Sequence, residues 1–324
     1  TIKAYMDSAT RSDGYSIQVG YQALMNWMKP RADTVHSLNK PFWMYIQSDV
    51  TPERHLAPNE LKVLINMVVA MGGSGVGYFT YVDLYKDDII PRPAPLEFSQ
   101  SIDEDEPPSV AYATLGETYE SPEAATAVVE VGGLVSWNPQ NKYYEPNARW
   151  YAAREAHTFI DSIWHTLQDL TWMNCVNWKN VSQLGGPSLS RIKSLSFDSA
   201  QTWVDVSRFT SSQGDEYLMF LNRRSLSSDS QNVLIEMINR PGLVRFHDVY
   251  RNTDYDCYDS CGTVRFTTHF APAELKLFKV THIERFKGAW SGTWPQYSTI
   301  KVVGDVTVNM GTTLTVQSGN VTVL

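Results

Sequence analysis

The sequence predicts an α/β segment followed by an all-β segment, because the hydrophobic period changes partway along the chain. Before residue 170, short apolar runs alternate with stretches whose apolar residues recur at helical spacing. After it, apolar and polar residues alternate in short runs separated by turn residues, as in a β-sandwich. At 324 residues the chain is long enough for about two domains and the beginning of another.

The α/β segment is expected to contain a β-α-β unit with parallel strands. Residues 41–48 form a nearly unbroken apolar and aromatic run, which is typical of a strand buried on both faces. A helix is predicted over 58–71, with Asn59 as its N-cap and Gly72-Gly73 as its end. A second strand is predicted over 75–81, and such short connections make the two strands neighbours.

Helices and a long loop are expected around this unit. Apolar residues at helical spacing predict helices over 17–38 and 148–170. Residues 82–143 are rich in proline and contain the acidic run 103–106, so they are predicted to be a loop. An insertion that follows a parallel strand lies at the carboxyl end of that strand, where α/β folds keep their sites.

The all-β segment is predicted to be an antiparallel β-sandwich over 171–284, followed by a short β-solenoid start over 285–324. The solenoid prediction rests on Val306-Thr-Val308, Leu314-Thr-Val316 and Val321-Thr-Val323, which recur at nearly regular spacing. The expected strands of the sandwich are 202–209, 216–223, 232–238, 244–250, 263–270 and 274–280.

Composition excludes some partners and leaves others open. The formal charge of −8 provides no basic field for nucleic acid, and no apolar run is long enough for a membrane span. Aromatic residues make up 12% of the chain, which suits sugar binding and large cores equally. Cys257 and Cys261 could form a disulfide in an oxidising compartment. Ligands at zinc-site spacing are lacking, so we expect neither a metal nor a cofactor.

The segments Pro41–Gln47 (PFWMYIQ), Asn59-Glu-Leu and Ala70–Tyr81 (AMGGSGVGYFTY) resemble the last two strands of glycoside-hydrolase (β/α)8 barrels. The resemblance is closest to β-galactosidase-like and related retaining enzymes. It implies that residues 1–170 are the C-terminal part of such a barrel, that a sandwich domain follows, and that the substrate is a poly- or oligosaccharide with O-glycosidic bonds. The ending from residue 290 resembles the entry into β-helix modules of large secreted proteins, which implies a secreted or cell-surface location.

Both ends of the chain look cut, and the resemblance then places part of the catalytic machinery outside it. Retaining glycosidases need a proton donor and a carboxylate nucleophile. In the resembled family the donor ends the fourth strand, which would precede Thr1, and the nucleophile ends the seventh, which would be residues 42–47. Gln47 stands near the nucleophile's position, and an amide cannot form a glycosyl ester. The chain alone is therefore expected to be inactive.

Carboxylates at the carboxyl ends of predicted strands are the candidates for a catalytic role, because barrel enzymes collect their catalytic groups there. The same residue types are common on exposed loops, where they have no specific role. The candidates are Asp7, Asp49, Glu53 and Asp83.

Gln47, Tyr45 and Tyr81 are the expected substrate-binding residues. Strand alternation puts Trp43, Tyr45 and Gln47 on one face, which we assign to the barrel interior. Gln47 could bond a sugar hydroxyl, or it could be a buried amide with satisfied hydrogen bonds. Tyr78 is a further candidate for the sugar site, whereas Trp43 is expected to fill the core.

Two functions remain open at this point: a glycoside hydrolase, and a carbohydrate-binding or cell-surface scaffold that has lost catalysis. Gln47 in place of an acid favours the scaffold. The barrel-like ending and the appended sandwich favour the hydrolase. An Asn-Glu pair that ends a fourth strand in upstream sequence would distinguish the two.

Overall fold

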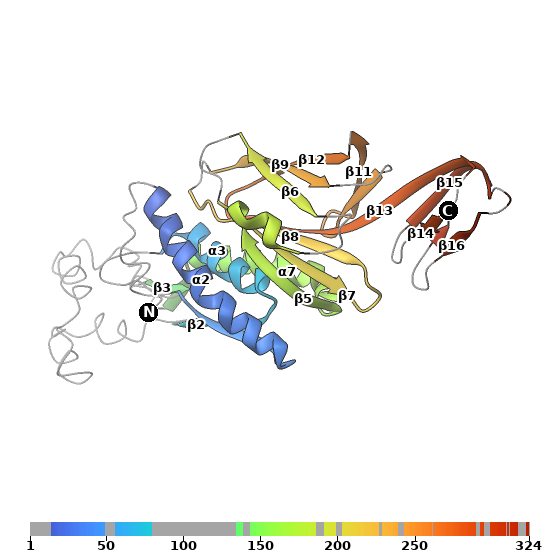
Figure 1. Ribbon diagram of the computed structural model, residues 1–324. Helices are drawn as coiled ribbons and strands as arrows, with labels where there is room; N and C mark the ends of the chain where they lie inside the picture. The colour runs from blue at the N-terminus through green and yellow to red at the C-terminus, as the bar shows by residue number, and fades with distance from the viewer. Residues whose placement is uncertain are drawn as a thin grey trace, which may run out of the picture.

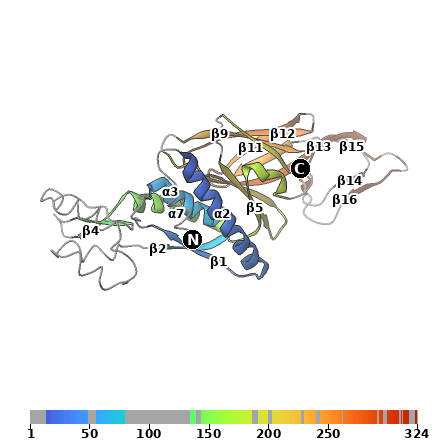
Figure 2. The same cartoon turned by 60° about the vertical axis from the view of Figure 1, so that its left-hand side comes forward.

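The computed structural model describes residues 14–48, 56–79, 134–138, 143–185, 191–198, 203–226, 229–238, 243–260, 262–289, 292–294, 299–308, 310, 312–316 and 322–323. The fold mixes helices with strands that are mostly antiparallel. A small parallel sheet, a layer of helices and a β-sandwich-like pair of strand layers follow one another across the molecule (Figures 1 and 2).

The small sheet pairs β1 (Phe42–Gln47) with β2 (Gly73–Phe79) in parallel, as predicted. Helix α3 (Pro58–Ala70) connects the two strands. The predicted N-cap at Asn59 is wrong, because the helix already begins at Pro58, a residue whose fixed φ and missing N–H suit the first helical position. The backbone N–H of Ala57 donates to the Glu60 carboxylate at 2.8 Å and so ties the first turn together.

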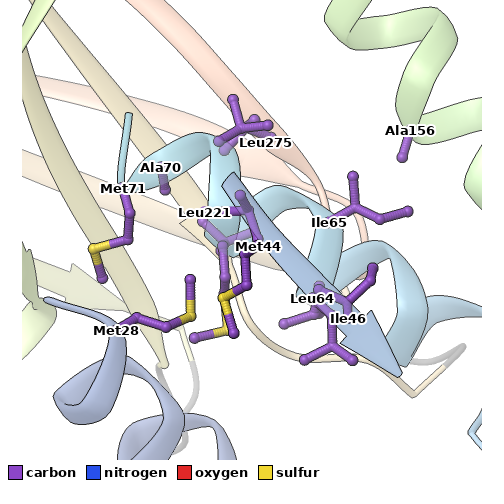
Figure 3. Close-up of a cluster of buried hydrophobic side chains, with 14 of the residues drawn as sticks. Met28, Met44, Ile46, Leu64, Ile65, Ala70, Met71, Ala156, Leu221 and Leu275 are labelled. Atoms are coloured by element: carbon purple, nitrogen blue, oxygen red, sulfur yellow. The ribbon is translucent and has the colours of Figure 1, made fainter. Parts of the chain in front are cut away.

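Helix α3 is buried on all sides because it lies between the small sheet and the sandwich. Its apolar side chains contact β1 on one side and the sandwich strands on the other, and Figure 3 shows Ile46 beside Leu64. A helix that is apolar all round is expected in such a position. One core thus joins the α/β part to the sandwich.

Two further helices confirm the helical predictions for 17–38 and 148–170, but the interruption that Pro30 predicts in the first is wrong, because the helix continues through this residue. Helix α2 spans Gly14–Ser37 and helix α7 spans Ala148–Leu167. In the described part of the chain, no helix is long and apolar enough to cross a membrane. Part of the predicted loop 82–143 instead forms a hairpin, in which β3 (Val135–Asn138) pairs antiparallel with β4 (Tyr143–Pro146).

The Asn147 side chain caps α7, and its oxygen accepts from the backbone N–H groups of Arg149 and Trp150 at 2.9 and 3.1 Å. Replacing Asn147 with alanine is expected to lower the free energy of unfolding by about 1 kcal/mol. Asn59→Ala is the control and should change it by less than about 0.5 kcal/mol. Urea unfolding of both variants measures the difference, and equal losses would contradict this account of the caps.

The sandwich consists of two facing layers, with the order β5-β7-β8-β13-β10 in one and β12-β9-β6 in the other, linked through β11. Strand β8 is buried on both faces, because one face meets the helices and the other meets the second layer. The strands are β5 (Leu170–Asn177), β6 (Ile192–Phe197), β7 (Val204–Ser211), β8 (Glu216–Asn222), β9 (Gln231–Ile238), β10 (Leu243–Asp248), β11 (Thr253–Ser260), β12 (Thr263–Phe270) and β13 (Leu275–Ala289), with the 3-10 helix η2 (Trp178–Gln183) after β5.

The six predicted strands of the sandwich are confirmed with small shifts, whereas β5, β6 and β11 were not predicted. Strand β11 occupies a stretch rich in aspartate, whose residues Asp254, Asp256 and Asp259 predict an acidic turn rather than a strand. Its outward carboxylates pair across the strands: Asp256 accepts from Arg245 at 2.6 Å, and Asp254 contacts His247 at 2.7 Å. Cross-strand ion pairs of this kind stabilise a strand whose own pattern is not apolar.

Parallel pairing begins where the sandwich ends. Strand β13 runs across the predicted boundary at 284 and pairs in parallel with β15 (Thr299–Thr307), which pairs in parallel with β17 (Thr322–Val323). Strand β14 (Gly292–Trp294) pairs in parallel with β16 (Leu314–Val316). The predicted triplets supply residues to β15, β16 and β17.

Candidate functional site

The outward face of β1 is the candidate site, because it exposes large aromatic side chains. Alternation along the strand buries Phe42, Met44 and Ile46 against the helices. The opposite face carries Trp43, which is 65% exposed, and Tyr45, which is 75% exposed. We call Trp43 and Tyr45 the aromatic platform.

Glycines of β2 lie beneath the aromatic platform. The parallel register places Trp43 opposite Gly75 and Tyr45 opposite Gly77. A Cβ atom added to Gly75 would lie 2.5 Å from Cε3 and Cζ3 of Trp43, and one added to Gly77 would lie 2.5 Å from Cδ1 and Cε1 of Tyr45. The two rings therefore cover the bare backbone of Gly75 and Gly77, which we call the glycine floor.

The platform has the geometry of a stacking surface. Each ring packs on the glycine floor with one side and is largely exposed, and the two residues are about 6.6 Å apart along the strand. The face of an aromatic ring carries negative quadrupolar charge, which attracts the slightly positive C–H groups of a sugar ring. Tyrosine and tryptophan also carry polar edges that can hydrogen-bond hydroxyl groups.

The structure describes some of the site residues predicted from the sequence and leaves others outside its described part. Tyr45 shares a face with Trp43, as predicted, but the expectation that Trp43 fills the core is wrong, because the helices cover the other face of β1. The backbone of Gln47 pairs with Phe79, whereas the side chain of Gln47 lies outside the described part of the structure. The remaining candidates, Asp7, Asp49, Glu53, Asp83 and Tyr81, also lie outside it.

Tyr78 does not belong to the platform. It alternates with the glycine floor and faces α7, where its hydroxyl forms a short hydrogen bond with Nε2 of His157. Burial raises the pKa of the Tyr78 hydroxyl and lowers the pKa of His157, so both groups are neutral near pH 7. A sugar contact by Tyr78 stays a prediction, and in the structure the residue links β2 to α7.

Cysteine chemistry adds nothing to this site. Cys175 is a buried free thiol, and Cys257 in β11 is also free, while Cys261 lies outside the described residues. Burial raises the pKa of both described thiols, which makes them poor nucleophiles. Across the described ranges, His, Cys, Asp and Glu form no group that could hold a metal ion.

The glycine floor is the part of the site that the sequence reading missed. Its signal is the alternation in Gly73-Ser-Gly75-Val-Gly77, since glycine at every second position of a strand marks a face on which something approaches the backbone closely. Read together with the alternation of Trp43 and Tyr45, it would have indicated aromatic rings lying on bare backbone.

No protein-family model matches the chain, and no curated protein is significantly similar to it. A function must therefore be inferred from the residues of the chain itself.

Proposed function

We propose that the chain is part of a carbohydrate-active protein and that the aromatic platform binds the sugar rings of a poly- or oligosaccharide. The observation that carries the proposal is the exposure of Trp43 and Tyr45 side by side over Gly75 and Gly77. Single exposed aromatic residues are ordinary on protein surfaces. Two adjacent rings over a floor without side chains form a flat apolar surface with polar edges, which suits a sugar better than an irregular apolar partner.

We further propose that the protein is related to glycoside hydrolases. In this proposal β1, α3 and β2 derive from the end of a (β/α)8 barrel, the strands from β14 to β17 begin a β-solenoid, and the protein acts outside the cell or at its surface. The sequence resemblance and the parallel pairing of β1 with β2 support this relation. Hydrolysis would require two carboxyl groups beside the platform, for which Asp7, Asp49, Glu53 and Asp83 are the candidates. A carbohydrate-binding scaffold without catalysis is the second candidate function, which Gln47 favours.

Trp43→Ala is expected to weaken glycan binding at least about fivefold, because the lost stacking contributes on the order of 1 kcal/mol or more. The control is Trp164→Ala, which removes a 42% exposed tryptophan from α7, away from β1. A panel of soluble polysaccharides is screened by affinity electrophoresis, and the best ligand is then titrated calorimetrically against each variant.

Retention of wild-type affinity by Trp43→Ala, or an equal loss in Trp164→Ala, would contradict the proposed site. Tyr45→Ala, compared with the exposed Tyr151→Ala on α7, repeats the test at the second ring. Release of reducing ends from the bound polysaccharide would favour the hydrolase over the scaffold and would contradict the expectation that this chain alone is inactive. Binding without release is expected of this chain under either function.

A further inference from the structure

A polar cluster, buried except for the half-buried Gln22 and Asn177, lies where helix α2 meets the sandwich. Its members come from segments far apart in sequence, and they lie among apolar core residues such as Met25 and Leu221. The cluster consists of Gln18 and Gln22 from α2, Cys175 and Asn177 from β5, Asp205 and Ser207 from β7, and Arg223 directly after β8.

Arg223 connects the sandwich to α2. Its Nη2 donates to Oε1 of Gln22 at 3.0 Å, and its backbone oxygen accepts from Nε2 of Gln18 at 2.9 Å. Asn177 also donates to Oε1 of Gln22, at 3.3 Å. Helix α2 therefore docks on the sandwich through three hydrogen bonds, one of which comes from a buried guanidinium group.

The charge on Arg223 is balanced by Asp205, but incompletely. Nε of Arg223 lies 3.3 Å from Oδ2 of Asp205, and the two side chains are 0% and 2% exposed. Among the residues that the structure describes, Oδ1 of Asp205, and Nε and Nη1 of Arg223, have no hydrogen-bond partner. A carboxylate that is buried with so few donors is poorly stabilised in its charged form.

We propose that the Asp205–Arg223 pair is a proton-controlled latch, in which uptake of a proton by Asp205 tightens the docking of helix α2 on the sandwich. The buried position of the pair, the unpartnered Oδ1 and the bonds from Arg223 to α2 carry the proposal. It holds whether or not the aromatic platform binds sugar.

The direction of the effect follows from proton linkage. Burial raises the pKa of Asp205 from 3.8 to about 6, and the positive charge of Arg223 opposes this rise. When α2 undocks, water reaches Asp205 and its pKa returns towards the ordinary value. Between about pH 4 and pH 6 the docked form thus holds a proton that the undocked form releases, so docking strengthens as pH falls through 6 and weakens as pH rises above it.

Other groups around Asp205 do not reverse this sign. From β5 it faces Cys175, whose pKa is raised chiefly by burial, so the thiol stays neutral throughout. The buried face of α2 contributes the neutral Gln18 and Tyr21. Lys29 of the same helix is a cation that acts on Cys175 and pairs with Asp33 at 2.9 Å near the surface.

Amide hydrogen exchange of the full chain at pH 5.0 and pH 7.5 tests the latch. After correction for intrinsic exchange rates, protection of the α2 amides is expected to be about tenfold greater at pH 5.0, as a pKa of about 6 in the docked form and an ordinary pKa in the undocked form imply. Amides of α7, which lack contact with Asp205, serve as the internal reference. Asp205→Asn imitates the protonated form and should make α2 protection nearly independent of pH.

Equal protection of α2 at the two pH values, or a parallel change in α2 and α7, would overturn the latch. So would an Asp205→Asn variant that keeps the pH dependence. If that variant fails to fold, the carboxyl carbon of Asp205 is titrated by NMR in the wild-type chain. A midpoint near 6 is expected, and a midpoint below 4.5 would contradict the proposal.

Discussion

Replacing Gly73 with alanine is expected to lower the free energy of unfolding by about 3 kcal/mol. A Cβ atom at Gly73 would lie 2.4 Å from Cγ1 of Val68 and 2.6 Å from the backbone oxygen of Val68. That oxygen belongs to α3, which is packed between the small sheet and the sandwich and cannot shift without disturbing both. Urea unfolding followed by circular dichroism measures the loss.

Gly75→Ala is the matched variant on the same strand. It should lower glycan affinity and leave the free energy of unfolding nearly unchanged. Its Cβ atom would meet the ring of Trp43, which is exposed and can swing away from the sheet. We expect the free energy of unfolding to change by less than about 1 kcal/mol, while glycan affinity falls as much as in Trp43→Ala. Similar destabilisation by Gly73→Ala and Gly75→Ala would contradict the description of the glycine floor.

Replacing Arg223 with methionine is expected to destabilise the chain by about 3 kcal/mol at pH 7, because it leaves Asp205 buried without its counter-charge. Arg223 holds the pKa of Asp205 down, so in the variant that pKa rises further above its ordinary value. The loss should therefore be smaller at pH 5, where Asp205 is closer to its neutral form. Thermal and urea unfolding at the two pH values measure both effects.

The double variant Asp205→Asn, Arg223→Met should recover part of this loss, since it removes both buried charges. Arg265→Met is the control, because Arg265 pairs with Glu236 at the surface and is 59% exposed. It should change the free energy of unfolding by no more than about 0.5 kcal/mol. An Arg223→Met variant as stable as Arg265→Met would show that the buried pair does not stabilise the fold.

The spacing of apolar residues along the sequence was sufficient to predict the helices, the parallel strand pair and most of the sandwich. The apolar run of residues 41–48 predicted a strand buried on both faces, and the described strand β1 follows within one residue at each end. The burial on both faces was wrong, because Trp43 and Tyr45 are exposed on one face. Strand β11 escaped the same reading because ion pairs to β10 replace apolar side chains on its outward face. Such pairs depend on register, which a single strand's sequence does not contain.

The candidate site was predictable only in part, for a similar reason. Alternation placed Trp43 and Tyr45 on one face of β1, but the exposure of Trp43 depends on which face the helices cover. The latch was not predictable at all. Gln22 and Arg223 are brought together from opposite ends of the chain, and neither shows a local sign of the contact.

Binding of a sugar to the aromatic platform can be followed at the platform itself through the indole N–H signals of the protein. The chain contains 10 tryptophans, and the Trp43 signal is assigned by its loss in Trp43→Ala. On titration with an oligosaccharide cut from the best polysaccharide ligand, the Trp43 signal is expected to shift in a saturable manner while that of Trp164 stays in place. A saturable shift at other tryptophans with none at Trp43 would contradict the account.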